Sequence, residues 1–331
     1  MLIQCLLTLF IISYEAVASP CSEFNLLHQP QSPFLELEVY DQSTLNICYA
    51  MAASDLINYE LLKAKLASKI HPIWIAYIYA KNKLKKNLDI GITKEALLGL
   101  KSLPGCTFEE IQAALGYKYG ESIYKKISDF MQRFDENGYS KIEELEKKLP
   151  ATCFNDSAIK VDLEPMRLDF RQLPDDSDYE EYIDEVLNLK KIPISITYCS
   201  NIWRNIQYDG IDFNGKGLRD RLSKNCHYHE SIILGKKRLS NQCHFLVRNS
   251  WGKKWTKDNS GFQCVCKNKK TGKIKDECNS KEDKDEEVLA CWLPAVSLSR
   301  NTGAITLIQG MRTIPDLSPP SSNASPKSLP E

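Results

Sequence analysis

The sequence predicts an α+β fold in two lobes, with helices first and strands later in the chain. The stretch 48–70 contains neither glycine nor proline, and its apolar residues recur at helical spacing. After residue 190, short β-branched runs appear, which are typical of strands. We therefore expect a helical lobe over about residues 45–175 and a lobe of strands over about 178–311.

The first long helix is expected to begin near Cys48 and to continue towards Ile70, with Asn46 as its N-cap. The region 107–185 is rich in lysine, glutamate and aromatic residues, and we interpret it as a series of amphipathic helices. Helices are expected over 94–102, 108–115, 121–134, 142–148 and 179–189.

The strand signals come later and are shorter. Strands are expected over 192–198, 231–234 and 244–248. Residues 267–287 are dense in charge and poor in apolar side chains, so we expect a solvated loop anchored by neighbouring cysteines. The segment 312–331 is rich in proline and serine and should form a disordered tail. The folded domain would then cover residues 19–311.

Length and charge limit the possible functions. A chain of 331 residues can bury a sizeable core in one large or two modest domains. Lysine plus arginine number 43, as do aspartate plus glutamate, so no overall field directs the protein to nucleic acid or to acidic membranes. The longest internal apolar stretch, 73–80, is too short to span a bilayer. There is no phosphate-binding glycine loop, and no cofactor is expected.

The N-terminus has the features of a signal peptide. Leu2–Ile12 is mostly apolar, and Ala16, Val17 and Ala18 offer the small residues of a cleavage site. We expect residues 1–18 to be removed and the protein to be secreted or exported to the periplasm. The alternative is a short buried N-terminal helix.

Cysteine usage agrees with export. Of twelve cysteines, Cys5 lies in the expected signal peptide and Cys48 opens the first helix. The remaining ten are an even number, as a disulfide framework around one free thiol requires. Their pairing stays open. They are Cys21, Cys106, Cys153, Cys199, Cys226, Cys243, Cys264, Cys266, Cys278 and Cys291.

Four residues could together perform acyl transfer on a thiolate. Cys48 is placed at a helix N-terminus, which lowers the pKa of a thiol. His229 opens one expected strand and Asn249 closes the next, so the asparagine could orient the imidazole. Gln42, six residues before the cysteine, could help to form an oxyanion hole. Read singly, these are ordinary residues: a bridged cysteine, a turn asparagine, a surface glutamine.

Three separated segments resemble the papain-like cysteine peptidases. Gln42–Ala50 resembles the family's nucleophile motif, His229–Gly235 is similar to its histidine strand, and Phe245–Gly252 closely matches its asparagine motif. The resemblance implies a helical lobe and an antiparallel β-barrel-like lobe with an active-site cleft between them. It also implies that the substrates are proteins or peptides.

The resemblance assigns roles to individual residues. Cys48 would be the nucleophile, His229 the general acid and base, Asn249 the orienting residue and Gln42 the oxyanion donor. These are the catalytic candidates. Substrate-binding candidates follow from the same resemblance. Gly91 looks like the glycine that lines the cleft, Glu230 follows the histidine where a small residue is typical, and Trp251 belongs beside the asparagine–histidine bond.

The chain also departs from the family pattern. Leu45 replaces a cysteine that usually forms a bridge, Tyr49 replaces a tryptophan, and Ile90 precedes Gly91 where a second glycine is common. The region 107–185 is the expected insertion. Only about thirty residues separate the expected cleavage site from Cys48, so we expect restraint other than by the usual propeptide, or activity on export.

Three alternatives to a peptidase are compatible with parts of the sequence. A catalytically inactive relative could act as a secreted binding or inhibitory protein. Zinc binding by Cys226 and His227, or by Cys243 and His244, is disfavoured because adjacent residues on a strand point to opposite faces. Transglutaminase-like transfer would use aspartate in place of Asn249. The oligomeric state, the cleaved sequence and the choice between endo- and exopeptidase stay open.

Overall fold

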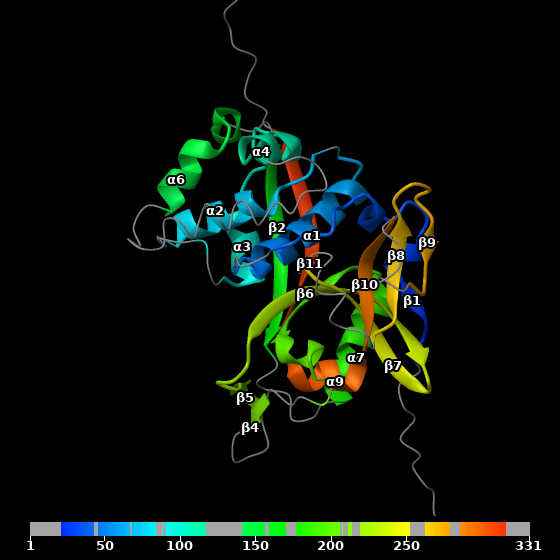
Figure 1. Ribbon diagram of the computed structural model, residues 1–331. Coiled ribbons are helices and arrows are strands. Elements are labelled where there is room, and N and C mark those ends of the chain that lie inside the picture. Colours follow the sequence, from blue (N-terminus) through cyan, green and yellow to red (C-terminus); the bar gives the residue numbers. More distant parts are fainter. Residues whose placement is uncertain are drawn as a thin grey trace, which may run out of the picture.

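The computed structural model describes residues 21–42, 46–66, 68–83, 88, 91–116, 141–155, 159–169, 177–205, 207, 211–213, 219–251, 262–278 and 285–315. Within this part of the chain, helices pack against an antiparallel sheet of nine strands (Figure 1). The α+β class expected from the sequence is confirmed. The expected signal peptide, the helix expected over 121–134 and residues 316–331 lie outside the described residues.

The helices gather in two groups. In Figure 1, α1 to α4 and α6 gather around the long pair β2 and β11 in the upper part of the view, whereas α7 and α9 lie together in its lower part. Their bounds are α1 Cys48–Lys63, α2 Pro72–Asn82, α3 Thr93–Gly99, α4 Phe108–Ala114, α6 Lys141–Lys148, α7 Ser177–Glu185 and α9 Ala295–Asn301. No helix in the described part is both long and apolar enough to cross a membrane.

Helix α1 begins at Cys48, as expected, but differs at both flanks. Its N-cap is Ile47, which makes no side-chain cap bond, so the expected cap at Asn46 is wrong. Burial explains this, because Ile47 is fully buried while Asn46 is exposed. The helix ends at Lys63 rather than near Ile70, because Lys65 adopts a left-handed conformation and the Ile70 amide donates to Asn58 Oδ1 at 2.7 Å.

The main sheet runs in the order β2-β11-β3-β6-β7-β10-β8-β9, with β1 also paired to β6, and β4 and β5 form a separate hairpin. The bounds are β1 Phe24–Asn25, β2 Ile159–Asp169, β3 Ile194–Cys199, β4 Ile211–Phe213, β5 Arg219–Leu222, β6 Tyr228–Leu239, β7 Gln242–Arg248, β8 Cys264–Asn268, β9 Ile274–Lys275, β10 Glu286–Pro294 and β11 Thr302–Pro315. The sheet is open, with β2 and the two-residue β9 at its edges, so the expected barrel-like closure is corrected.

Two strand regions differ from the sequence-based expectation. Strand β2 lies within the expected helical lobe and pairs with β11 along its length, and β11 continues past residue 311 to Pro315. The charged segment 267–287 is not wholly a loop, because it contains β9 and the adjoining ends of β8 and β10, which pair in antiparallel fashion. The apolar parts of β8 and β10 lie just outside this segment and are buried, as at Val265 and Val288.

Five disulfides join the ten cysteines for which the sequence predicts bridges. Cys48 is the only free cysteine in the described part of the chain. The expectation that these ten cysteines form a disulfide framework is thus confirmed. Cys264 and Cys266, two positions apart on β8, bond to different partners. The pairs are Cys21–Cys243, Cys106–Cys153, Cys199–Cys226, Cys264–Cys291 and Cys266–Cys278.

Candidate active site

Cys48 is the first residue of α1, and its side chain is partly exposed. The main-chain amides of Glu230, Tyr49 and Cys48 itself favour the ionised form of the thiol. Burial and the nearby carboxylate of Glu230 act more strongly in the opposite direction and raise the pKa of the thiol to about 12. The amides at the helix start therefore lower the pKa of the thiol, as expected, but they do not by themselves produce a thiolate.

His229 lies near the start of β6 and is held from several directions. Its Nε2 donates to Asn249 Oδ1 at 2.7 Å, since an amide oxygen can only accept. The centroids of the Trp251 and Tyr198 rings lie 4.6 Å and 5.7 Å from the centroid of the imidazole, and Tyr198 meets it edge to face. Burial lowers the pKa of His229 to about 4, although the bond to Asn249 partly offsets this effect. The imidazole is therefore neutral at pH 7.

Asn249 follows β7 directly, and its amide has a defined orientation. Besides the bond from His229, its Oδ1 accepts the main-chain N–H of Ser250 at 2.7 Å. The oxygen therefore faces the histidine. Among the described residues, no hydrogen bond joins Cys48 directly to His229; the thiol instead lies against the amide of the next residue, Glu230.

Gln42 reaches the same site through Ser250. Its main-chain N–H donates to the Ser250 carbonyl at 2.8 Å, and Ser250 Oγ donates to Gln42 Oε1 at 2.7 Å. Asp41 and Trp251 form an isolated β-bridge beside this contact. With Oε1 bound to the serine, the NH₂ group of Gln42 is the end that remains to face a substrate. Residues 43–45, which connect Gln42 to the helix, lie outside the described part.

Glu230 is buried between β6 and β3. Thr197 Oγ1 donates to its carboxylate at 3.3 Å, and the guanidinium of Arg167 donates to the same hydroxyl at 3.4 Å. Burial raises the pKa of Glu230 to about 7, while Arg167 and the Thr93 amide favour the ionised form. The sequence showed only that Glu230 stands where the resembled family typically has a small residue; the structure adds that this carboxylate raises the pKa of the Cys48 thiol.

Gly91 lies against the ring of Tyr49, and a Cβ built at Gly91 would come within 2.5 Å of that ring. The Tyr49 hydroxyl donates to the Leu88 carbonyl at 2.8 Å, and its ring lies 4.9 Å from Tyr79. The tyrosine that replaces the usual tryptophan is therefore accommodated by the glycine that the sequence placed in the cleft.

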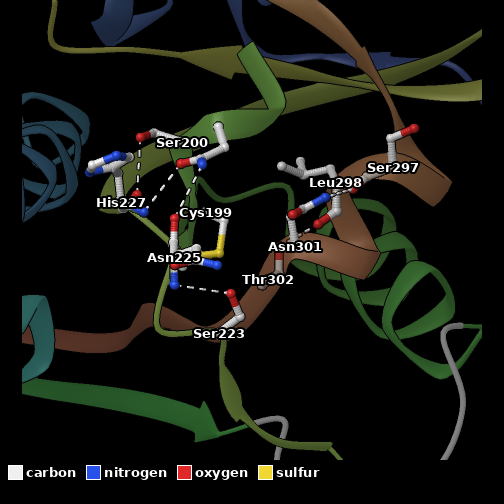
Figure 2. Close-up of a disulfide and its surroundings, with 11 residues drawn as sticks. Cys199, Ser200, Ser223, Asn225, His227, Ser297, Leu298, Asn301 and Thr302 are labelled. Atoms are coloured by element: carbon white, nitrogen blue, oxygen red, sulfur yellow. Dashed lines mark hydrogen bonds between the residues drawn. A yellow bond between two sulfur atoms is a disulfide. The ribbon is translucent and has the colours of Figure 1, made fainter. Parts of the chain in front are cut away.

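Sequence reasoning missed the support beneath the histidine. Figure 2 shows the Cys199–Cys226 disulfide, which joins the end of β3 to the approach to β6. Next to it, the amide and hydroxyl of Ser200 both donate to the carbonyl of His227. Tyr198 also bonds to Ser231 at 3.0 Å. The sequence signals for this support were the β-branched run that predicted β3 and the place of Cys199 and Cys226 in the expected disulfide framework, whose pairing the sequence left open.

The described residues offer little to a metal ion. One cluster, formed by Cys266, Cys278 and Glu286, has ligand atoms within 4.8 Å of one another, but its two sulfurs form a disulfide. Both cysteines of the zinc alternative, Cys226 and Cys243, are also bridged. A disulfide sulfur is not the thiolate ligand that zinc requires.

The sequence matches no protein-family model and no curated protein. Among solved structures, the chain is similar to xylellain, a cysteine protease from Xylella fastidiosa, with 16% identity over 90% of each chain and a TM-score of 0.49. It is also similar to procathepsin L2 proteinase from the larval midgut of Tenebrio molitor (14% identity, 88% of this chain, 69% of the other, TM-score 0.41). A third is bromelain protease from Ananas comosus (14%, 82% and 93%, TM-score 0.36). At these values the likeness concerns the fold alone, and the site is judged on its own geometry.

Proposed function

We propose that this protein is a secreted cysteine peptidase in which Cys48 forms a thioacyl-enzyme. One observation carries the proposal. His229 has a buried hydrogen bond to Asn249, and the main-chain amide of the next residue, Glu230, contacts the only free thiol of the described residues, at a helix N-terminus. A nucleophile, a base and a residue that orients the base are the parts that this chemistry needs.

The resting electrostatics favour a neutral thiol and a neutral imidazole, so the proton should move during attack. His229 would take the proton of Cys48 through Nδ1 while the sulfur bonds to the substrate carbonyl carbon. The imidazolium would then protonate the departing amine as the C–N bond breaks. Water, deprotonated by His229, would attack the thioester, release the acid and restore the thiol.

Two neighbours would stabilise the charges that develop. Asn249 Oδ1 already accepts the Nε2 proton and would stabilise the imidazolium. The NH₂ of Gln42 and the main-chain N–H of Cys48 would bind the oxyanion, each contributing roughly 3–4 kcal/mol to the barrier reduction. Protein or peptide substrates follow from this chemistry, and no cofactor is needed. Five disulfides and the expected signal peptide support export to an oxidising compartment.

A second candidate is a non-catalytic secreted binding protein of the same fold. The observation that favours it is the thiol pKa of about 12, raised by burial and by Glu230. A thiol held in this state reacts slowly unless the histidine assists it. The two candidates therefore differ in whether Cys48 can be acylated.

The deciding experiment is to label the folded protein at pH 7 with a thiol-directed epoxide peptidase inhibitor and to map the modified residue by mass spectrometry. We expect modification at Cys48 and hydrolysis of a denatured protein substrate in mild reductant. Cys48→Ala should remove both while leaving the five disulfides and the circular dichroism spectrum unchanged. A folded wild-type protein that is neither labelled nor active would establish the binding protein instead.

A further inference from the structure

A small cavity lies between α1, β6 and β7, next to the residue that orients the histidine. Asp55 of α1, Arg248 of β7 and Asn249 line it, and all its lining residues are buried. Its volume of about 10 Å³, counted as the space open to the centre of a water molecule, is enough for roughly one water.

Each of these three residues has one buried polar atom without a hydrogen-bond partner among the described residues. The atoms are Asp55 Oδ1, Arg248 Nη1 and Asn249 Nδ2. A buried polar group left unpaired costs about 1–3 kcal/mol, and such groups are rare in folded proteins. A fourth such atom, Glu230 Oε2, belongs to another residue that lines the cavity. Unpaired polar atoms gathered around one cavity indicate a ligand that pairs with them.

The rest of the hydrogen-bonding capacity of these residues is already used. Arg248 donates from Nε to Asp55 Oδ2 at 3.0 Å and from Nη2 to the carbonyls of Leu37 and Glu38. Asn249 Oδ1 accepts from His229 and from the Ser250 amide. Together with Glu230 Oε2, the unpaired atoms of the lining are thus two donors and two acceptors.

We propose that this cavity binds one ordered water molecule, which accepts from Asn249 Nδ2 and Arg248 Nη1 and donates to Asp55 Oδ1. Water is the ligand that matches a lining of both donors and acceptors, since it both donates and accepts; its second proton can be directed to Glu230 Oε2. An anion would face the carboxylate of Asp55, and a cation would face the guanidinium of Arg248.

Asp55 then becomes a positioning residue for the proposed reaction. If the Asn249 amide turned over, its NH₂ would face the Nε2–H of His229, donor against donor. A water held by Asp55 and Arg248 gives the NH₂ an acceptor on the far side and keeps the oxygen towards the histidine. The proposed peptidase supplies only the kinetic readout of this inference; the water itself does not depend on it.

The first test is a crystal structure of the full exported chain at high resolution. We expect water density within hydrogen-bond distance of all three atoms. A cavity with no ordered density, or density within hydrogen-bond distance of only one of them, would overturn the proposal. This measurement needs neither activity nor a variant.

The second test is Asp55→Asn, which keeps the shape of the side chain but can present an NH₂ in place of Oδ1. We expect kcat to fall roughly tenfold with little change in KM. The titration midpoint of His229, followed by NMR of its ring, should move to lower pH because the bond from His229 to Asn249 raises its pKa. A variant that merely loosened the structure would hydrate the ring and move the midpoint upward. An unchanged or raised midpoint would contradict the positioning role.

The matched control is Asp184→Asn, because Asp184 forms another buried ion pair, with Lys236, and neither residue lines the cavity. It should lower stability but leave the His229 midpoint in place. Besides Asp55 and Arg248, the titratable groups that surround the cavity and the histidine are Cys48 on α1, Tyr198 on β3, Glu230 on β6 and Tyr40 before α1. If the wild-type protein proves inactive, the NMR midpoints still decide this inference separately from the proposed function.

Discussion

The two halves of the candidate site are built in different ways. The half that carries the base comes from the adjacent strands β6 and β7, whose antiparallel ladder brings His229 beside Asn249. The half that carries the nucleophile comes from the start of α1, where, within the described part of the chain, Cys48 has no hydrogen bond to the histidine. The sheet therefore holds the histidine in a defined position, whereas the helix places the thiol without a hydrogen bond that would fix it to the histidine.

This difference has an electrostatic counterpart. The resting state of His229 suits the proposed role of a base, because burial lowers its pKa and keeps the imidazole neutral and able to accept a proton. The resting state of Cys48 does not suit the proposed role of a nucleophile, because burial and Glu230 both raise the pKa of its thiol and oppose its ionisation. We infer that restraint of activity lies in the nucleophile half. Changes to the two halves should therefore have distinguishable consequences.

Removing the base should have the largest effect. His229→Ala should lower kcat/KM on a peptide substrate by on the order of 10³-fold, since no other group can take the thiol proton. Alkylation of Cys48 by iodoacetamide at high pH should continue, because hydroxide can still deprotonate the thiol. Loss of both would mean that the variant has disturbed the nucleophile half as well.

The control for this variant is the other fully buried histidine. His71 caps α2, where its Nδ1 accepts the Ile73 amide at 3.1 Å, and burial lowers its pKa to about 3. His71→Asn keeps an acceptor at the cap and should leave turnover intact, at a cost of about 1 kcal/mol in stability. A similar loss of turnover in both variants would show that the His229 effect is not specific to the site.

Removing the orienting residue should have an intermediate effect. Asn249→Ala leaves the imidazole without its partner at 2.7 Å, and we expect kcat to fall about 10- to 100-fold while some turnover remains. The acid limb of the pH profile should move to lower pH, because the lost bond raised the pKa of His229. Steady-state kinetics between pH 3 and 8 would measure both changes. An acid limb that stayed in place would separate Asn249 from the histidine.

Relieving the nucleophile half should increase reactivity. Glu230→Gln removes the carboxylate that raises the pKa of Cys48, so iodoacetamide alkylation at pH 8 should become roughly tenfold faster. Below about pH 7 the wild-type carboxyl is protonated, and the difference should shrink. A variant no more reactive than the wild-type protein at pH 8 would show that Glu230 does not restrain the thiol.

The same substitution should change the pH dependence of stability. The folded pKa of Glu230, about 7, lies above its ordinary value of 4.5, so the folded state holds this proton more tightly. Its contribution is fully present below pH 4.5 and is lost as the pH rises through 7, by roughly 3 kcal/mol. Denaturant titrations at pH 5 and pH 8 should show this loss in the wild-type protein and not in Glu230→Gln.

Local patterns in the sequence were sufficient for the elements that carry the site. The absence of glycine and proline after Cys48 gave the start of α1, and β-branched runs gave β3, β6 and β7. Strand β2 was missed because charged side chains occupy its exposed face and only Val161 and Leu163 are buried in alternation. Contacts between distant positions were beyond such patterns. The pair Asp55–Arg248 spans 193 residues, and nothing local to either residue indicates the other.

The smallest expected effect concerns the packing next to the nucleophile half, where Gly91 leaves room for the ring of Tyr49, the residue that follows Cys48. Gly91→Ala places a methyl group 2.5 Å from that ring, and we expect a loss of about 1–3 kcal/mol in unfolding free energy. Turnover of the folded fraction should change little if the glycine serves packing rather than substrate binding. In a Tyr49→Leu background, which has lower stability of its own, the cost of Gly91→Ala should nearly vanish, because the clashing ring is gone. A double-mutant cycle in urea measures this coupling. If the alanine instead raises KM with no loss of stability, Gly91 contacts substrate, as the sequence motif suggested, and Tyr49 must be able to move away from it.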